Sequence, residues 1–351
     1  MIHRQPEDAQ TLHAELLALL LALDGDRGWS HLAGSFTTKT IAGGEYVYFQ
    51  YSDPGGTKRQ LSIGPKTKTL DAILVRRRQQ RELHLKELVT TERLGRLLHV
   101  AGGVGLPHAV ARVVGALADA GVFRLGGVLI GSYSFALVGS ALGVAWPEVA
   151  WRTQDLDLAG HLQIAAPAVQ ASVPGALESL QMGFVPVPQL DPRHASTSFK
   201  IRGKQLRVDL LTPGMDGQVD PVFIPRFQAA AAPIKYLSLL IEEAMPAPAV
   251  HARGAVLVLV PTPARLALHK LLVSQTRSLV QQTKSGKDLH QAALLLEVLA
   301  ADRPDDLEST GRSFARSGPA VTSKVLRGLA AAEKRWPEAR EGGKLVRASM
   351  R

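Results

Sequence analysis

The segment that most constrains the fold is a short run of alternating residues, Asp155-Leu156-Asp157-Leu158. Successive side chains of a β-strand point to opposite faces, so the two carboxylates share one face and the two leucines share the other. The leucine face needs a hydrophobic core, whereas burying two like charges without a partner is costly. The segment therefore predicts a strand that separates a core from an open, charge-bearing site.

A third carboxylate follows on another expected strand. Residues 199–211 predict two strands joined by a turn, and on the second of them Val208 faces the core while Asp209 faces the other side. Phosphoryl and nucleotidyl transfer need carboxylates that hold two divalent cations about 3.5–4 Å apart. The three aspartates are therefore candidate metal ligands. Asp209 could equally pair with Arg207 on the same strand face.

Upstream of the acidic pair, an apolar segment leads into a glycine and a serine. Residues 122–130 predict a strand, Gly131-Ser132 a turn, and residues 133–143 a helix. Glycine lets a phosphate approach the backbone, and a serine hydroxyl and a helix N-terminus can bind it. We interpret the turn as a triphosphate cradle. The alternative is an ordinary strand-to-helix turn with a serine cap.

The order of these elements resembles the DNA polymerase beta-like nucleotidyltransferase superfamily: strand, Gly-Ser, helix, Asp-x-Asp strand, and a later strand with a single Asp. The resemblance implies a nucleoside triphosphate as substrate and Mg²⁺, or Mn²⁺, as cofactor. By that resemblance Gly131 and Ser132 bind the nucleotide, and Asp155, Asp157 and Asp209 are the catalytic metal ligands. The long interval before the acidic pair implies an insertion around residues 139–151.

A second resemblance lies downstream, where residues 263–289 are similar to the helical part of bacterial abortive-infection and toxin-type nucleotidyltransferases. It implies that Lys270, Arg277 and Asp288 contribute to nucleotide binding, and it makes a cognate antitoxin one candidate partner. The alternatives are that Lys270 is an ordinary surface lysine and that Asp288 pairs with Lys284 on one helix face.

The chain is expected to form an α+β fold with a small mixed β-sheet nucleotidyltransferase core. Expected divisions are an N-terminal helix, β-hairpin and basic helix (1–105), the core (106–235), a helical C-terminal domain (236–335) and a polar tail (336–351). Within them we expect a helix at 8–24, a hairpin at 45–64, a basic helix at 70–98, a helix at 107–120, a strand at 155–164, a helix at 166–182, a Pro-rich break at 245–248 and a strand at 256–260.

Charge and composition narrow the partners. The net charge of +10 favours polyanions such as nucleic acids or nucleotides. The run Arg76-Arg77-Arg78, near the aromatic hairpin, could bind an RNA backbone, or it could be a solvated helix face. The absence of cysteine excludes disulfides and thiolate metal sites. The longest apolar run near the N-terminus, Leu16–Leu23, is too short to span a membrane, so we expect a cytoplasmic protein with no membrane partner.

Together these features predict an enzyme that moves a nucleoside monophosphate from a nucleoside triphosphate to an acceptor hydroxyl, with tRNA or another nucleic acid as acceptor. Two alternatives keep the same fold. One is a catalytically idle nucleic-acid-binding protein, and the other is a nucleotide sensor that binds without transferring.

Overall fold

The computed structural model describes residues 3–25, 34–52, 58–160, 171–277 and 282–351, and it has the expected α+β architecture. The helices are α1 (Glu7–Gly25), α2 (Lys68–Val100), α3 (His108–Asp119), α4 (Gly131–Ala141), α5 (Glu148–Trp151), α6 (Val173–Ser179), α7 (Leu237–Ile241), α8 (Pro263–Ser274), α9 (Gln282–Asp302), α10 (Pro304–Arg316), α11 (Pro319–Arg335) and α12 (Arg340–Ser349). The strands are β1 (His3–Arg4), β2 (Ser35–Ile41), β3 (Gly44–Ser52), β4 (Lys58–Pro65), β5 (Val128–Ile130), β6 (Val144–Ala145), β7 (Asp155–Ala159), β8 (Phe184–Pro186), β9 (Ser198–Ile201), β10 (Arg207–Gly214), β11 (Val222–Ile224), β12 (Ala229–Lys235), β13 (Ala244–His251) and β14 (Gly254–Pro261).

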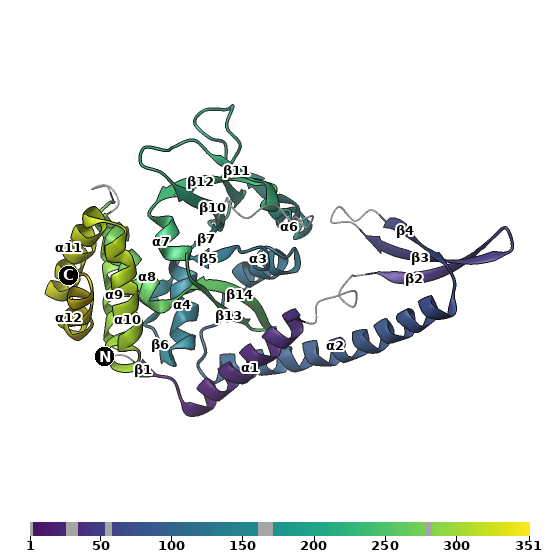
Figure 1. Cartoon of the computed structure of the whole chain (residues 1–351), viewed down its shortest axis with the longest axis horizontal. Coiled ribbons are helices and arrows are strands. Elements are labelled where there is room, and N and C mark those ends of the chain that lie inside the picture. Colours follow the sequence, from purple (N-terminus) through teal and green to yellow (C-terminus); the bar gives the residue numbers. More distant parts are fainter. Residues whose placement is uncertain (1–2, 26–33, 53–57, 161–170, 278–281) are drawn as a thin grey trace.

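An arm, formed by β2, β3, β4 and the first half of α2, extends from the body of the molecule (Figure 1). The long helix α2 begins where the Thr67 side chain accepts a hydrogen bond from the Leu70 amide at 3.1 Å, which caps the first turn. The expected hairpin at 45–64 is instead part of a three-stranded antiparallel sheet, because β2 pairs with β3 along its whole length. The expected turn at 53–56 lies outside the described residues.

The central sheet has the strand order β11-β12-β10-β7-β5, with β9 and β8 added beside β10. Strand β10 runs parallel to β7 and β12, and β5 runs antiparallel to β7, so the sheet is mixed. The expected strand at 122–130 begins only at Val128, because Gly121 and Gly126 adopt positive φ angles and turn the chain before it. The strand expected at 155–164 ends at Ala159, and residues 161–170 lie outside the described part.

The expected Pro-rich break at 245–248 is wrong, because these residues belong to β13, which forms a hairpin with β14. Pro246 and Pro248 lie two residues apart, so their missing N–H groups lie on one edge of the strand. That edge can be the unpaired one, since β13 pairs only with β14 within its two-stranded sheet. The region 236–335 therefore contains a β-hairpin between the short helix α7 and the helices α8 to α11.

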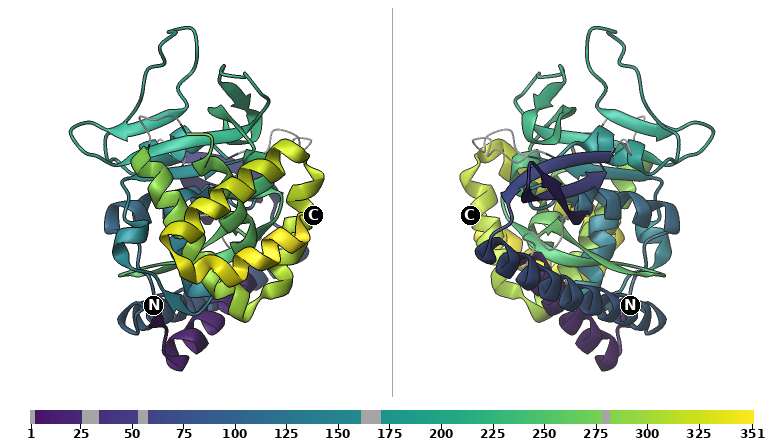
Figure 2. Two further views of the ribbon diagram at one scale, coloured as in Figure 1. Left: turned by 90° about the vertical axis from the view of Figure 1, so that its left-hand side faces the viewer. Right: turned by 90° about the vertical axis from the view of Figure 1, so that its right-hand side faces the viewer.

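Helices α8 to α12 cover one side of the core, and the arm projects from the other side (Figure 2). Residues 336–351, expected as a polar tail, form a short 3-10 turn and α12, which packs against α9 and α10. Val346 is fully buried, and Gly342 lets the α12 backbone approach Leu296 so closely that a Cβ would lie 2.6 Å from its carbonyl oxygen. Within the described residues, no helix combines the length and apolar character needed to cross a bilayer.

Candidate active site

A cavity of about 600 Å³ lies between the β5–α4 turn, strands β7 and β10, the end of β12, and helices α8 and α9. It brings together all the candidate residues of the core and the C-terminal helices: Gly131, Ser132, Asp155, Asp157, Asp209, Lys270, Arg277 and Asp288. These residues come from segments that are far apart in the sequence. The arginine run at 76–78 lies on α2 and is not among the lining residues.

The two acidic strands lie side by side in the sheet. In the parallel pairing of β7 with β10, Asp209 stands opposite Asp157, with both carboxylates on the cavity side. The alternating residues Leu156, Val208 and Leu210 are buried on the other side. The predicted division of each strand into a core face and a charged face is therefore present.

Electrostatic interactions among the three carboxylates change the pKa of Asp157. Burial, followed by the charges of Asp209 and Asp155, raises the pKa of Asp157 from 3.8 to about 6. An elevated carboxyl pKa means that the folded protein disfavours the ionised form. The position of Asp157 between two like charges is thus costly unless a cation shares the site.

Each of the other two carboxylates has a cationic neighbour. Asp209 accepts a hydrogen bond from the Nε of Arg207 at 2.6 Å and another from the Ser198 hydroxyl. The alternative pairing of Asp209 with Arg207 is therefore confirmed. The Nζ of Lys284 lies 3.8 Å from Asp155, and both of these side chains are well exposed.

The donor set has the chemistry that a hard divalent cation prefers, which is carboxylate oxygen. In the described part of the chain, however, no group of three or more His, Cys, Asp or Glu side chains is arranged to hold a metal ion. Arg207 and Ser198 both donate hydrogen bonds to Oδ1 of Asp209, so this oxygen is already engaged. The Arg207 side chain that makes this contact is 45% exposed.

The glycine of the predicted cradle is required by its conformation. Gly131 has φ +74°, and a Cβ at this position would overlap the carboxylate of Asp157. Helix α4 begins at Gly131, its N-cap is Ile130, and no side chain caps it. The alternative in which Ser132 caps this helix is therefore wrong, since Ser132 lies within the first turn. The first amide groups of α4 remain without a side-chain acceptor at the edge of the cavity.

Lys270 and Arg277 converge on one carboxylate. Lys270 is only 5% exposed, and its Nζ lies 3.2 Å from Oδ1 of Asp288, while Arg277 lies 2.7 Å from Oδ2. The alternatives of a surface Lys270 and of an Asp288–Lys284 pair are therefore wrong. One carboxylate shared by two cations leaves net positive charge at this wall, and it fixes the position of both cationic side chains.

Sequence reasoning missed several lining residues. Lys235, Lys284 and Lys287 add positive charge, and His269 lies against Lys270. Burial, followed by the charge of Lys270, lowers the pKa of His269 to about 3, so this imidazole is neutral. The available signal was the spacing of Lys284 and Lys287, which lie three residues apart in the first part of α9 and hence on one helix face.

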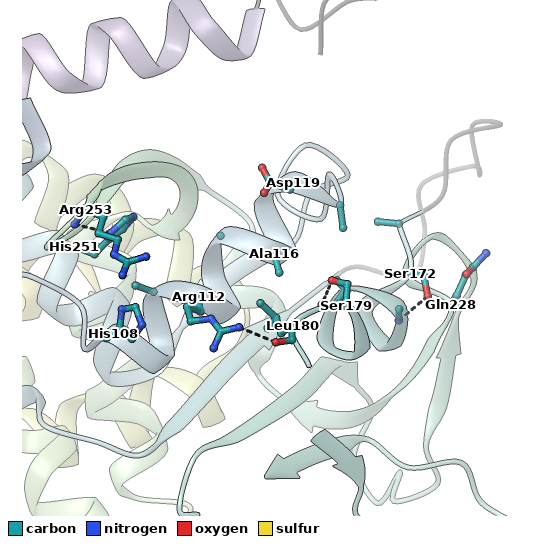
Figure 3. A pocket seen from close by; sticks show the side chains of 16 residues that line it. His108, Arg112, Ala116, Asp119, Ser172, Ser179, Leu180, Gln228, His251 and Arg253 are labelled. Carbon is teal, nitrogen blue, oxygen red and sulfur yellow. Dashed lines mark hydrogen bonds between the residues drawn. The ribbon is translucent and has the colours of Figure 1, made fainter. Parts of the chain in front are cut away.

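A larger cavity, of about 760 Å³, lies between α3 and α6 and is shown in Figure 3. Its lining has basic side chains at one end, including His251 and Arg253, and Arg112 donates a hydrogen bond to the Leu180 carbonyl at 2.7 Å. Asp119 is the acidic residue in its lining, so it has no pair of carboxylates. Size therefore does not identify the reactive site, because the smaller cavity contains the groups that chemistry needs.

Comparison with known families agrees with this assignment of the chemistry. Residues 108–316, more than half of the chain, match the model of a nucleotidyltransferase family. No curated protein and no solved structure matches the chain. The matched span runs from α3 to α10, contains the candidate residues of the cavity, and leaves the arm outside. The chain belongs to this nucleotidyltransferase family and is a nucleotidyltransferase enzyme.

Proposed function

We propose that the protein is a Mg²⁺-dependent enzyme that transfers a nucleoside monophosphate from a nucleoside triphosphate to a hydroxyl group of a nucleic-acid acceptor. The observation that carries this proposal is the convergence, within the family-matched span, of three carboxylates and a wall of cationic side chains on one cavity. Carboxylates alone would suit many metal sites. Carboxylates that face several lysines and an arginine suit a substrate that is both metal-bound and polyanionic.

Asp155 and Asp157 would hold the cation, and Asp209 would join them after Arg207 rotates away. When bound, Mg²⁺, or Mn²⁺, supplies charge neutralisation for the triphosphate and polarises the reacting oxygens. The raised pKa of Asp157 supports this assignment, because neighbouring negative charges that oppose its ionisation are the feature that a divalent cation would relieve. Arg207 would hold the carboxylate of Asp209 in position when the cation is absent.

The triphosphate would lie between the start of α4 and the cationic wall. The uncapped amides around Gly131 can donate to phosphate oxygens, and Ser132 adds a hydroxyl on the same side. Lys270 and Arg277, fixed by Asp288, face the cavity from α8 and the chain after it. Asp288 is thus a positioning residue, whose carboxylate orients two cations and does not itself contact an anionic substrate.

Asp209 is the carboxylate suited to take the proton of the acceptor hydroxyl. The acceptor oxygen then forms a bond with the α-phosphorus, the bond from that phosphorus to the bridging α–β oxygen breaks, and pyrophosphate leaves with the electron pair. Ser198 donates to Asp209 and orients it for this role. The cationic wall stabilises the charge that develops on the leaving pyrophosphate.

The net charge of +10 supports a nucleic acid such as tRNA as the acceptor. A sequence-independent attraction of this kind raises the local concentration of a polyanion without selecting its sequence. We do not extend the proposal to a toxin role or an antitoxin partner, because the family match is to nucleotidyltransferases in general.

The test is transfer of label from each α-phosphate-radiolabelled nucleoside triphosphate, with Mg²⁺, to cellular RNA, DNA or protein supplied separately. The wild type should label a nucleic acid, whereas the Asp155→Asn/Asp157→Asn variant should not, because it keeps the shape of the site but loses two ionised ligands. Mg²⁺-dependent nucleotide binding with no labelled product would instead favour a sensor. Labelling of protein alone would contradict a nucleic-acid acceptor. Equal labelling by the wild type and the variant would contradict Asp155 and Asp157 as the catalytic site.

A further inference from the structure

The arm has one face that the helix α2 does not cover. Directly paired residues of antiparallel strands share a face, and residues alternate along each strand. The outer face defined by this register contains Ser35, Thr37 and Lys39 of β2, Tyr46, Tyr48 and Gln50 of β3, and Lys58, Gln60 and Ser62 of β4. A bulge between Val47 and Tyr48 shifts the register by one residue, so that Tyr46 stands opposite Pro65.

Helix α2 covers the middle of the opposite, inner face, and leaves Tyr51 and Leu61 of that face partly exposed. Val47 and Phe49 are buried there, and the guanidinium group of Arg77 lies 4.6 Å from the Phe36 ring centroid and 5.4 Å from that of Phe49. Arg81 donates to the Gly34 carbonyl at 2.9 Å. Arg77 is only 7% exposed, so the middle residue of the arginine run holds the sheet on the helix. The outer face is therefore the face of the sheet that α2 leaves uncovered along its whole length.

Apart from Ile41 and the tyrosine rings, the outer face is polar, and it carries no acidic side chain within residues 35–52 and 58–65. Glu45 precedes Tyr46 in β3, so by the strand alternation it lies on the inner face. Its carboxylate pairs with the Lys66 ammonium at 3.0 Å. The Lys39 ammonium lies 2.8 Å from the Gln60 amide oxygen and 5.1 Å from the centre of the Tyr48 ring. Hydroxyl and amide groups thus surround two lysines. Between residues 34 and 100 the sequence has twelve Lys and Arg against six Asp and Glu, which makes the whole arm basic.

We propose that the outer face of the arm binds B-form duplex DNA through its phosphate backbone and major groove. Lysine, hydroxyl and amide groups are the groups that bind phosphates and base edges. The major groove of B-DNA is wide enough for β-strands, whereas the corresponding groove of double-stranded RNA is too narrow for side chains to enter. Single strands are disfavoured, because they stack successive bases on several open aromatic rings, and Lys39 covers one of the two outer-face tyrosines, Tyr48.

This binding would be separate from catalysis. The arm lies outside the family-matched span and projects from the body of the molecule (Figure 1). The proposed DNA-binding surface is also distinct from the arginine run at 76–78. Arg77 packs against the sheet, whereas Arg76 and Arg78 are exposed on α2. Loss of DNA binding would therefore leave the nucleotidyl transfer chemistry at the cavity in place.

The test measures binding of the full-length protein to a short fluorescein-labelled DNA duplex of mixed sequence by fluorescence anisotropy. In the Lys39→Glu/Lys58→Glu variant, the loss of two phosphate contacts should weaken binding by about 60-fold at about 0.1 M salt and reduce the salt slope by about 2. The control is Lys334→Glu/Lys344→Glu, which makes the same charge change on exposed residues of the C-terminal helices. It should bind as the wild type does.

Equal loss in both variants, or absence of duplex binding by the wild type, would overturn the proposal. Binding of an RNA duplex, a single strand or an acidic polymer such as heparin that is tighter than that of the DNA duplex, and that the Lys39→Glu/Lys58→Glu variant loses, would also overturn it. Lysine acetylation provides a second measurement. It uses the wild-type protein alone, so its result does not depend on whether a variant folds. The DNA duplex should protect Lys39 and Lys58 from acetylation and leave Lys334 and Lys344 reactive, and protection of the second pair alone would contradict the outer face as the site.

Discussion

Replacing Asp157 with Asn should stabilise the protein while abolishing nucleotide transfer. The carboxyl pKa rises from 3.8 to about 6 on folding, first through burial and then through the charges of Asp209 and Asp155. A difference of about 2 pKa units opposes the folded, ionised state by about 3 kcal/mol at neutral pH. Because the side chain borders an open cavity, solvent screening reduces this, and we expect a gain of about 1–2 kcal/mol for Asp157→Asn.

The sign of the pH dependence follows from a folded pKa above the unfolded one. As the pH falls through about 6, the folded wild type takes up a proton before the unfolded chain does, so the wild type becomes relatively more stable. Below about pH 4 both states are protonated, and Asn resembles the neutral acid. The advantage of Asp157→Asn should therefore be full near pH 7 and absent near pH 4.

The assay is calorimetric unfolding in a chelating buffer near neutral and near acidic pH. With about 2.1 cal/mol/K of unfolding entropy per residue, the expected gain corresponds to a rise in Tm of about 1–3 °C if the chain unfolds in one transition. Asp191→Asn is the matched control, because Arg193 lowers the pKa of that exposed carboxyl to about 2, and its Tm should not rise. Addition of Mg²⁺ should stabilise the wild type more than Asp157→Asn. A variant that is less stable than the wild type near pH 7 would refute the reasoning.

Three further substitutions test other contacts. Gly131→Ala should reduce transfer at least tenfold in steady-state assays, because φ +74° disfavours a side chain and the new methyl group overlaps the carboxylate of Asp157; unchanged activity would contradict the close approach. Asp288→Asn should lower the free energy of unfolding in urea by about 3 kcal/mol, since it leaves Lys270 buried without its carboxylate; the double variant with Lys270→Met should recover part of this. Arg77→Ala should speed proteolysis of the arm without changing the Tm of the core, and equal proteolysis would contradict its stacking role.

The two acidic strands could be predicted because the pattern that defines them lies within a few consecutive residues. Alternation along β7 and β10 determines which side chains share a face, and burial of Leu156 and Val208 agrees with it. The resemblance predicted that Lys270 and Asp288 belong to one nucleotide-binding site, but it did not predict that the two side chains pair. The position of Lys284 beside Asp155 depends on how α9 docks against the sheet, and no sequence spacing specifies that.

The missed elements share a physical reason, which is that tertiary packing outweighs local composition. Strand β2 is rich in threonine and polar, but β3 provides its hydrogen-bond partners. Two prolines in β13 suggested a break, yet a strand edge without a neighbour tolerates them. Helix α12 is charged on one side, and Gly342 and Val346 on the other side pack against α9 and neighbouring helices.

The central claim is that the cavity around Asp157 transfers the α-phosphate group of a nucleoside triphosphate together with its nucleoside. The most direct measurement uses the same reaction with label in either the α- or the γ-phosphate, in wild type and Asp157→Asn. The account predicts that α-label enters the acceptor, that γ-label appears only in pyrophosphate, and that both signals vanish in the variant. Entry of γ-label into the acceptor would show phosphoryl transfer, and full α-label transfer by Asp157→Asn would show that the chemistry lies elsewhere.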